Sequence, residues 1–132
     1  MTADLSVLRA MAEGTAPVRD VSAIPLSLGG EEFWVDPEEI LFFASDGEKT
    51  TAITEQRLFY CDKKLYELAD LLPSFFRVSK SHIANLRAVR SLRKEITGIC
   101  EVKLGKEGKT VFVSRMYYKP FRERLMELHH VR

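Results

Sequence analysis

The basic side chains between residues 75 and 94 are the groups whose type and spacing best suit a chemical task. This segment, FFRVSKSHIANLRAVRSLRK, contains six lysines or arginines, one histidine and no acid. Ser79, Ser81 and Asn85, which suit hydrogen bonds to phosphates and base edges, lie among the charges. The pattern is typical of a site that binds a polyanion such as nucleic acid, and an ordinary solvated surface is the alternative.

The total charge of the chain hides this segment. Residues 1–74 contain fourteen acids and six bases, whereas residues 75–132 contain five acids and fourteen bases, and the formal net charge is +1. A second group of basic residues lies between positions 109 and 124, in a segment expected to return alongside the first. Because surface potential follows local charge, we expect the basic groups to gather on one exposed surface.

No residue pattern predicts a catalytic or metal site. The sequence GKEGKT at 105–110 has two residues between its glycines, whereas a phosphate-binding loop needs four and a helix after the threonine. Cys61 and Cys100 stand alone, and the three histidines lack the spacing of metal ligands. We therefore expect no enzymatic activity, no metal, no cofactor and no small-molecule substrate.

Short strands are the elements that must position the basic groups. Apolar runs between turn signals predict strands at 24–28, 33–35, 40–44, 50–54, 57–61, 75–78, 89–94, 99–104 and 110–113. Asp36 and Pro37 predict one helical turn, Asp62 the cap of a helix over 63–72, and helical spacing resumes from Tyr117. Residues 79–85 are predicted as an irregular turn or short helix. The expected fold is mainly β.

Length and hydropathy predict one cytoplasmic domain with a short extension. A chain of 132 residues suits one domain, and no apolar run approaches the roughly 20 residues of a membrane-spanning helix. The N-terminus lacks the pattern of a secretory signal, and residues 4–13 place Leu5, Leu8 and Met11 on one helical face. We predict an extension with a short amphipathic helix over residues 1–23 and the main domain over residues 24–132.

Four motifs resemble those of the LytTR family of DNA-binding domains, which occur in bacterial transcriptional regulators. Residues 76–86, FRVSKSHIANL, are similar to the family's Phe-x-Arg-hydrophobic-His-Arg-Ser-Tyr-hydrophobic-Val-Asn pattern. Glu39–Phe43, Lys64–Leu68 and Val113–Tyr118 resemble three further motifs, and the likeness extends over residues 24–128. Ser-Lys replaces the commoner His-Arg at 79–80, as in stand-alone regulators without a receiver domain, and about 23 residues precede the likeness.

The resemblance implies about ten short strands in small antiparallel sheets, with short helices and loops that enter successive major grooves, usually at direct repeats. The residues that it places at DNA are Lys49, Thr50, Arg77, Ser79, Lys80, Ser81, His82, Asn85 and Arg115. We expect Arg115 to read guanine, Arg77 to approach a phosphate, and Asn85 to hold its loop. Sequence-specific regulation of transcription, pairing of two copies on DNA and control by a membrane protein are further implications.

Two other functions remain open. A domain that binds RNA or single strands would stack bases on exposed aromatic rings, for which Phe75, Phe76, Tyr117 and Tyr118 are candidates. We expect at least Phe76 and one of these tyrosines to lie in the core instead. A protein-interaction module would use the acidic half of the chain.

Overall fold

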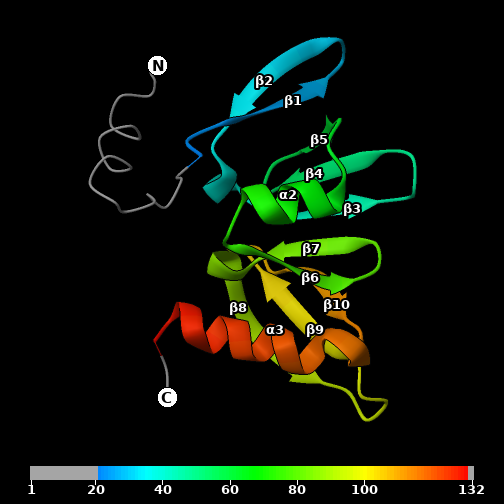
Figure 1. The fold of residues 1–132 in the computed structure, drawn as a ribbon, viewed down its shortest axis with the longest axis vertical. Helices are drawn as coiled ribbons and strands as arrows, with labels where there is room; N and C mark the ends of the chain where they lie inside the picture. Colours follow the sequence, from blue (N-terminus) through cyan, green and yellow to red (C-terminus); the bar gives the residue numbers. More distant parts are fainter. Residues whose placement is uncertain (1–20, 131–132) are drawn as a thin grey trace.

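Ten strands form two antiparallel sheets in the computed structural model, which describes residues 21–130 (Figure 1). The first sheet has the order β2-β1-β5-β4-β3-β7-β6 and the second the order β10-β9-β8. The ten strands of the two sheets are β1 (Ile24–Leu28), β2 (Glu31–Val35), β3 (Ile40–Ser45), β4 (Thr50–Thr54), β5 (Leu58–Cys61), β6 (Phe75–Ser79), β7 (His82–Asn85), β8 (Val89–Lys94), β9 (Cys100–Leu104) and β10 (Lys109–Val113). This confirms the mainly β fold.

Two α-helices complete the described part of the chain, α2 (Leu65–Leu71) and α3 (Arg115–Leu128), together with short 3-10 turns at Pro37–Glu39 and Leu86–Ala88. As predicted, Asp36 caps the first of these turns by accepting from the Glu38 N–H at 2.9 Å. The amphipathic helix predicted over residues 4–13 lies outside the described residues.

The predicted cap of the middle helix was wrong. Helix α2 begins at Leu65 rather than directly after Asp62, and Lys64 is its N-cap residue. The Glu67 carboxylate accepts a hydrogen bond from the Lys64 backbone N–H at 2.8 Å, which satisfies a donor at the helix start. This local bond fixes the first turn two residues later than the capping acid suggested.

The prediction for residues 79–85 was also wrong. Strand β6 continues to Ser79, a two-residue turn follows, and His82 begins strand β7. The register between the two strands shifts between Arg77 and Ser79, which obscures the regular alternation in the sequence. Strand β7 also pairs with β3, through Phe42 and Ala84 among others, so a distant partner stabilises it.

Two hydrophobic clusters hold the fold together. The first lies between the seven-stranded sheet and α2 and includes Phe43, Leu65 and Leu68. The second joins β6 and β7 to the three-stranded sheet and α3 through Val78 and Phe121, among others. Burying a side chain of this size contributes about 1.5–3 kcal/mol, so each helix is fixed on its sheet (Figure 1).

Candidate nucleic-acid interface

Three segments that are far apart in the sequence meet at one end of the strands. They are the β3–β4 loop (46–49), the β6–β7 turn (80–81) and the start of α3 (114–115), which lie at the right of Figure 1. The Ser45 N–H donates to the Ser81 carbonyl at 2.9 Å, and the Ser114 N–H donates to the Val78 carbonyl at 2.9 Å. These bonds fix the three segments relative to one another, and we call them together the loop edge.

The Asp46 carboxylate shapes the β3–β4 loop. Its Oδ1 accepts hydrogen bonds from the backbone N–H groups of Lys49 at 2.8 Å and Glu48 at 2.9 Å. The bonds from the Lys49 and Glu48 backbones lower the pKa of Asp46, so this side chain is an anion that stabilises its own loop. The result is a defined loop that presents Lys49 as an exposed side chain.

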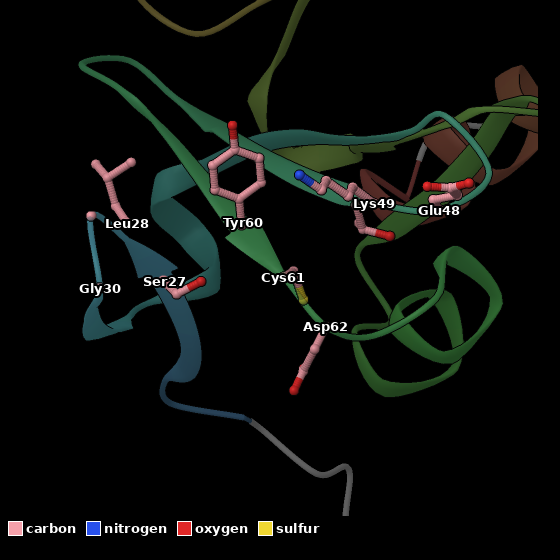
Figure 2. Close-up of a pocket in the computed structure, with 10 residues that line it drawn as sticks. Ser27, Leu28, Gly30, Glu48, Lys49, Tyr60, Cys61 and Asp62 are labelled. Carbon is pink, nitrogen blue, oxygen red and sulfur yellow. The ribbon is translucent and has the colours of Figure 1, made fainter.

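Lys49 points toward a groove beside the loop. Its Nζ lies 5.7 Å from the centre of the Tyr60 ring, and Figure 2 shows the side chain directed at that ring. The groove has a volume of about 400 Å³ and separates the loop from the β1–β2 turn at Gly29 and Gly30. An exposed cation–π contact is worth on the order of 0.5–1 kcal/mol, so Lys49 can leave the ring for a phosphate at small cost.

Arg77 holds the β6–β7 turn. Its Nη1 donates to the carbonyl of Lys80 at 2.7 Å and to that of Ser79 at 3.4 Å. Lys80 is exposed at the tip of the turn, and no acid among residues 21–130 lies within ion-pair distance of its ammonium. Arg77 therefore positions a turn that leaves Lys80 available to a ligand.

Ser79, Ser81 and His82 form a small polar cluster under this turn. His82 Nδ1 lies 2.9 Å from Ser81 Oγ and 3.3 Å from Ser79 Oγ, and Ser79 Oγ also accepts from the Ser81 N–H at 3.3 Å. Burial lowers the pKa of His82, so the half-buried imidazole is neutral near pH 7. These side chains shape the turn and add no positive charge to it.

Asn85 and Thr50 are buried, unlike the other predicted contact residues. Asn85 Nδ2 donates to the Ile40 carbonyl at 3.0 Å, and its Oδ1 accepts from the Arg87 N–H at 3.0 Å. Thr50 is 6% exposed as the first residue of β4. Both residues support the fold, and neither side chain is placed to reach a ligand.

Arg115 begins α3 and is exposed. Its aliphatic stem crosses Gly98 in the β8–β9 turn, since a Cβ built on that glycine would lie 2.5 Å from Arg115 Cδ. The charges of Arg115 and Lys80 thus lie on neighbouring segments, and the Ser114–Val78 hydrogen bond ties these together. Gly98 was not predicted as part of the site. The only signal in the sequence was a glycine in a turn between two predicted strands.

The basic side chains of residues 75–94 do not gather on one surface, contrary to expectation. Arg87 and Arg90 follow β7, so they lie at the other end of the strands from the loop edge. Arg87 pairs with Glu38 at 3.7 Å. Arg93 hydrogen-bonds Glu101, which raises the pKa of Arg93. Glu38 lies in the 3-10 turn Pro37–Glu39 and Glu101 in strand β9, so both acids lie outside the basic segment and its local sequence showed neither.

The four aromatic residues considered for base stacking are not exposed. Phe75 is buried in the first hydrophobic cluster, and Phe76, Tyr117 and Tyr118 are half-buried against the second. The ring of Phe76 lies 6.4 Å from that of Phe121, centre to centre. These contacts use a large part of each ring in packing, so none of the four presents a fully exposed face for stacking on single strands.

Cys61 and Cys100 are buried free thiols. Burial raises the pKa of both, so they are protonated near pH 7. Within residues 21–130, no three His, Cys, Asp or Glu side chains converge as metal ligands would. Neither helix of that part has the length and apolar character needed to cross a membrane.

Comparison with known proteins gives consistent matches. The sequence profile of the LytTr DNA-binding domain matches residues 31–126. Two proteins of Staphylococcus aureus, from strains NCTC 8325 and bovine RF122, are named as uncharacterized HTH-type transcriptional regulators. They are 34% and 35% identical to this chain over 92 and 88 residues. The matches cover 69% and 66% of this chain but 62% and 59% of the relatives, so the chain spans about three fifths of their length.

A solved LytTr DNA-binding domain from Bacillus cereus has the same fold. The TM-score is 0.73 at 22% identity, and the match covers 80% of this chain and 97% of that domain. Helices α2 and α3 are separated by strands β6 to β10, so residues 21–130 contain no helix-turn-helix. The fold agrees with the profile match, which covers well over half of the sequence. The chain therefore belongs to the LytTR family of DNA-binding domains.

Proposed function

We propose that this chain is a sequence-specific, double-stranded DNA-binding regulator of transcription that uses the loop edge to read the major groove. The observation that carries the proposal is the meeting of three distant segments, which brings Lys80 and Arg115 together without acidic partners in the described part. Family membership supports the choice of DNA as the polyanion. Free cations at one edge favour a phosphate-rich ligand because binding releases counterions.

The β6–β7 hairpin has a shape suited to a groove. The major groove of B-DNA, about 12 Å wide, admits a two-stranded β-ribbon. In this protein β6 and β7 are the last two strands of the seven-stranded sheet; the Lys80–Ser81 turn that joins them lies at the end of that sheet, and Arg77 holds the turn. We assign Lys80 to a guanine acceptor or a phosphate, and Ser81 to a phosphate oxygen.

Arg115 is the proposed base reader. A guanidinium can donate two hydrogen bonds to guanine O6 and N7, which discriminates against other bases by about 1–3 kcal/mol. Lys49 is assigned to a phosphate, since it can leave the Tyr60 ring at small cost. Arg77 still has N–H groups beyond those on Nη1 that could reach a phosphate. Thr50 and Asn85 are left out of the proposed contacts because they are buried.

Several parts of the proposal come only from the family resemblance. They are binding at direct repeats, pairing of two copies on DNA and control by a membrane protein. Action in the cytoplasm without catalysis was expected from the residue patterns, and it stays a prediction. The domain boundary between residues 23 and 24 likewise stays a prediction. Because the chain spans about three fifths of its relatives, these features of the whole protein are tested separately from DNA binding.

Selection from a pool of random duplexes tests the proposal. We expect enrichment of one motif, present twice at a fixed spacing if two copies bind direct repeats. Binding to the selected duplex should exceed binding to a scrambled duplex, and single-stranded DNA or RNA of the same sequence should compete weakly. Failure to enrich any motif, or stronger binding to single strands, would contradict the proposal.

A further inference from the structure

The β8–β9 turn contacts the proposed base reader through a glycine. Gly98 closes the turn by donating its N–H to the Glu95 carbonyl at 2.9 Å, and its φ is +95°. A Cβ added at Gly98 would lie 2.5 Å from Arg115 Cδ and 2.8 Å from Arg115 Cγ. Real Cβ atoms essentially never approach other atoms so closely, so any side chain at position 98 must displace Arg115.

This contact restricts a side chain that would otherwise be free. An exposed arginine has several rotatable bonds, and ordering them on binding costs conformational entropy. The backbone at Gly98 supports the middle of the Arg115 stem, while the guanidinium beyond it has no ion pair among residues 21–130. A supported stem and a free end are the features of a preorganised contact residue.

We propose that Gly98 is a positioning residue for Arg115, so that the β8–β9 turn sets the direction in which this arginine reaches DNA. The proposal rests on the function proposed above for Arg115. It adds a fourth segment to the DNA-reading surface, although Gly98 itself has no side chain to touch a base. Selectivity for the cognate sequence should therefore depend on the absence of a side chain at position 98.

The positive φ of Gly98 offers a simpler explanation for a glycine here, because L-residues are strained in that conformation. Gly30, in the β1–β2 turn, separates the two explanations. Its φ is +81°, but a Cβ built there has nothing within 4 Å. Gly30→Ala therefore imposes a similar backbone strain without displacing Arg115.

The experiment compares Gly98→Ala, Gly30→Ala, Arg115→Ala and the double variant Gly98→Ala/Arg115→Ala. Thermal unfolding and titration with the selected and scrambled duplexes are measured for each. We expect both glycine variants to lower the Tm by similar amounts, because the exposed Arg115 side chain can move into solvent without opening the core. Gly98→Ala alone should lower the selected-to-scrambled affinity ratio, up to the roughly 5- to 150-fold expected for Arg115→Ala. The double variant should match Arg115→Ala.

Three results would overturn the proposal in distinguishable ways. If Arg115→Ala keeps the selectivity, base reading by this arginine fails and the role of Gly98 fails with it. If Arg115→Ala loses selectivity but Gly98→Ala does not, the proposed function stands and the positioning role is wrong. An additional loss in the double variant would show that Gly98 acts independently of Arg115. Should Gly98→Ala not fold, Gly98→Asn and Gly30→Asn repeat the comparison, since Asn tolerates positive φ better.

Discussion

The two ends of the strands use their charged groups differently. At the loop edge, Lys80 and Arg115 are exposed, and no acid in the described part pairs with them. At the opposite end, which we call the junction end, charged side chains are bonded to other groups of the protein. There Arg87 pairs with Glu38, Arg90 donates to the carbonyls of residues 105 and 106, and the Glu55 carboxylate accepts from the Lys106 N–H.

This contrast shows that the number of cations does not predict how many can bind DNA. A free ammonium or guanidinium gains the full benefit of counterion release when it meets a phosphate. A cation already bonded to a carboxylate or carbonyl must give up that bond first. We therefore expect changes at the junction end to affect stability and changes at the loop edge to affect binding, and the following experiments test that division.

The largest effect is expected at Asn85. Replacing Asn85 with Ala leaves the Ile40 carbonyl and the Arg87 N–H without their buried partner. Such unsatisfied groups should lower the free energy of unfolding by about 2–3 kcal/mol, measured by urea denaturation. The folded fraction should bind DNA with nearly normal affinity, and a loss of cognate selectivity at full folding would show that Asn85 also contacts DNA.

A comparable effect, on binding instead of folding, is expected at Arg115. Arg115→Ala should weaken binding to the selected duplex by about 1–3 kcal/mol and change the unfolding free energy little. Binding to a scrambled duplex should fall much less, because a base contact carries sequence information and a phosphate contact does not. Equal losses on both duplexes would make Arg115 a phosphate contact.

Lys80 and Arg87 form a matched pair of exposed cations from the same basic segment. Lys80→Ala should reduce the slope of log affinity against log salt by about 0.9, the value for one lost phosphate contact. Arg87→Ala should leave the slope unchanged and cost at most about 1 kcal/mol of stability, since its ion pair with Glu38 is exposed. The division between the two ends is wrong if the two variants change the slope equally.

The smallest effect concerns pH and His82. Burial depresses the pKa of His82 in the folded state below its ordinary value of 6.5, so the unfolded chain binds the proton more readily. The stability from the neutral ring is present above pH 6.5 and is lost as the pH falls through the depressed pKa. The Tm of the wild type should therefore fall below pH 6.5 more than the Tm of His82→Gln does. Parallel pH profiles would mean that His82 titrates normally.

Most of the strands and the family could be predicted from the amino-acid sequence. Alternation in Cys100–Leu104 and turn glycines such as Gly105 are local signals, so nearly all strands were found at the correct positions. Strand β7 was the exception, because its four residues are too few for a clear local pattern and it is stabilised by pairing with β3, more than thirty residues earlier. The family motifs were recognisable because they are contiguous, and the profile match over residues 31–126 agrees with them.

Which charged side chains are available to a ligand depends on tertiary contacts and could not be read from the sequence. Hydrogen bonds between distant backbones bring the loop edge together, and acids from outside the basic segment, Glu38 in a 3-10 turn and Glu101 in β9, pair with Arg87 and Arg93. Tertiary contacts likewise determine that Thr50 and Asn85 are buried and that Arg115 lies across Gly98. The physical reason is that strand formation follows a local periodicity, whereas burial and ion pairing depend on which distant strands become neighbours in the sheet.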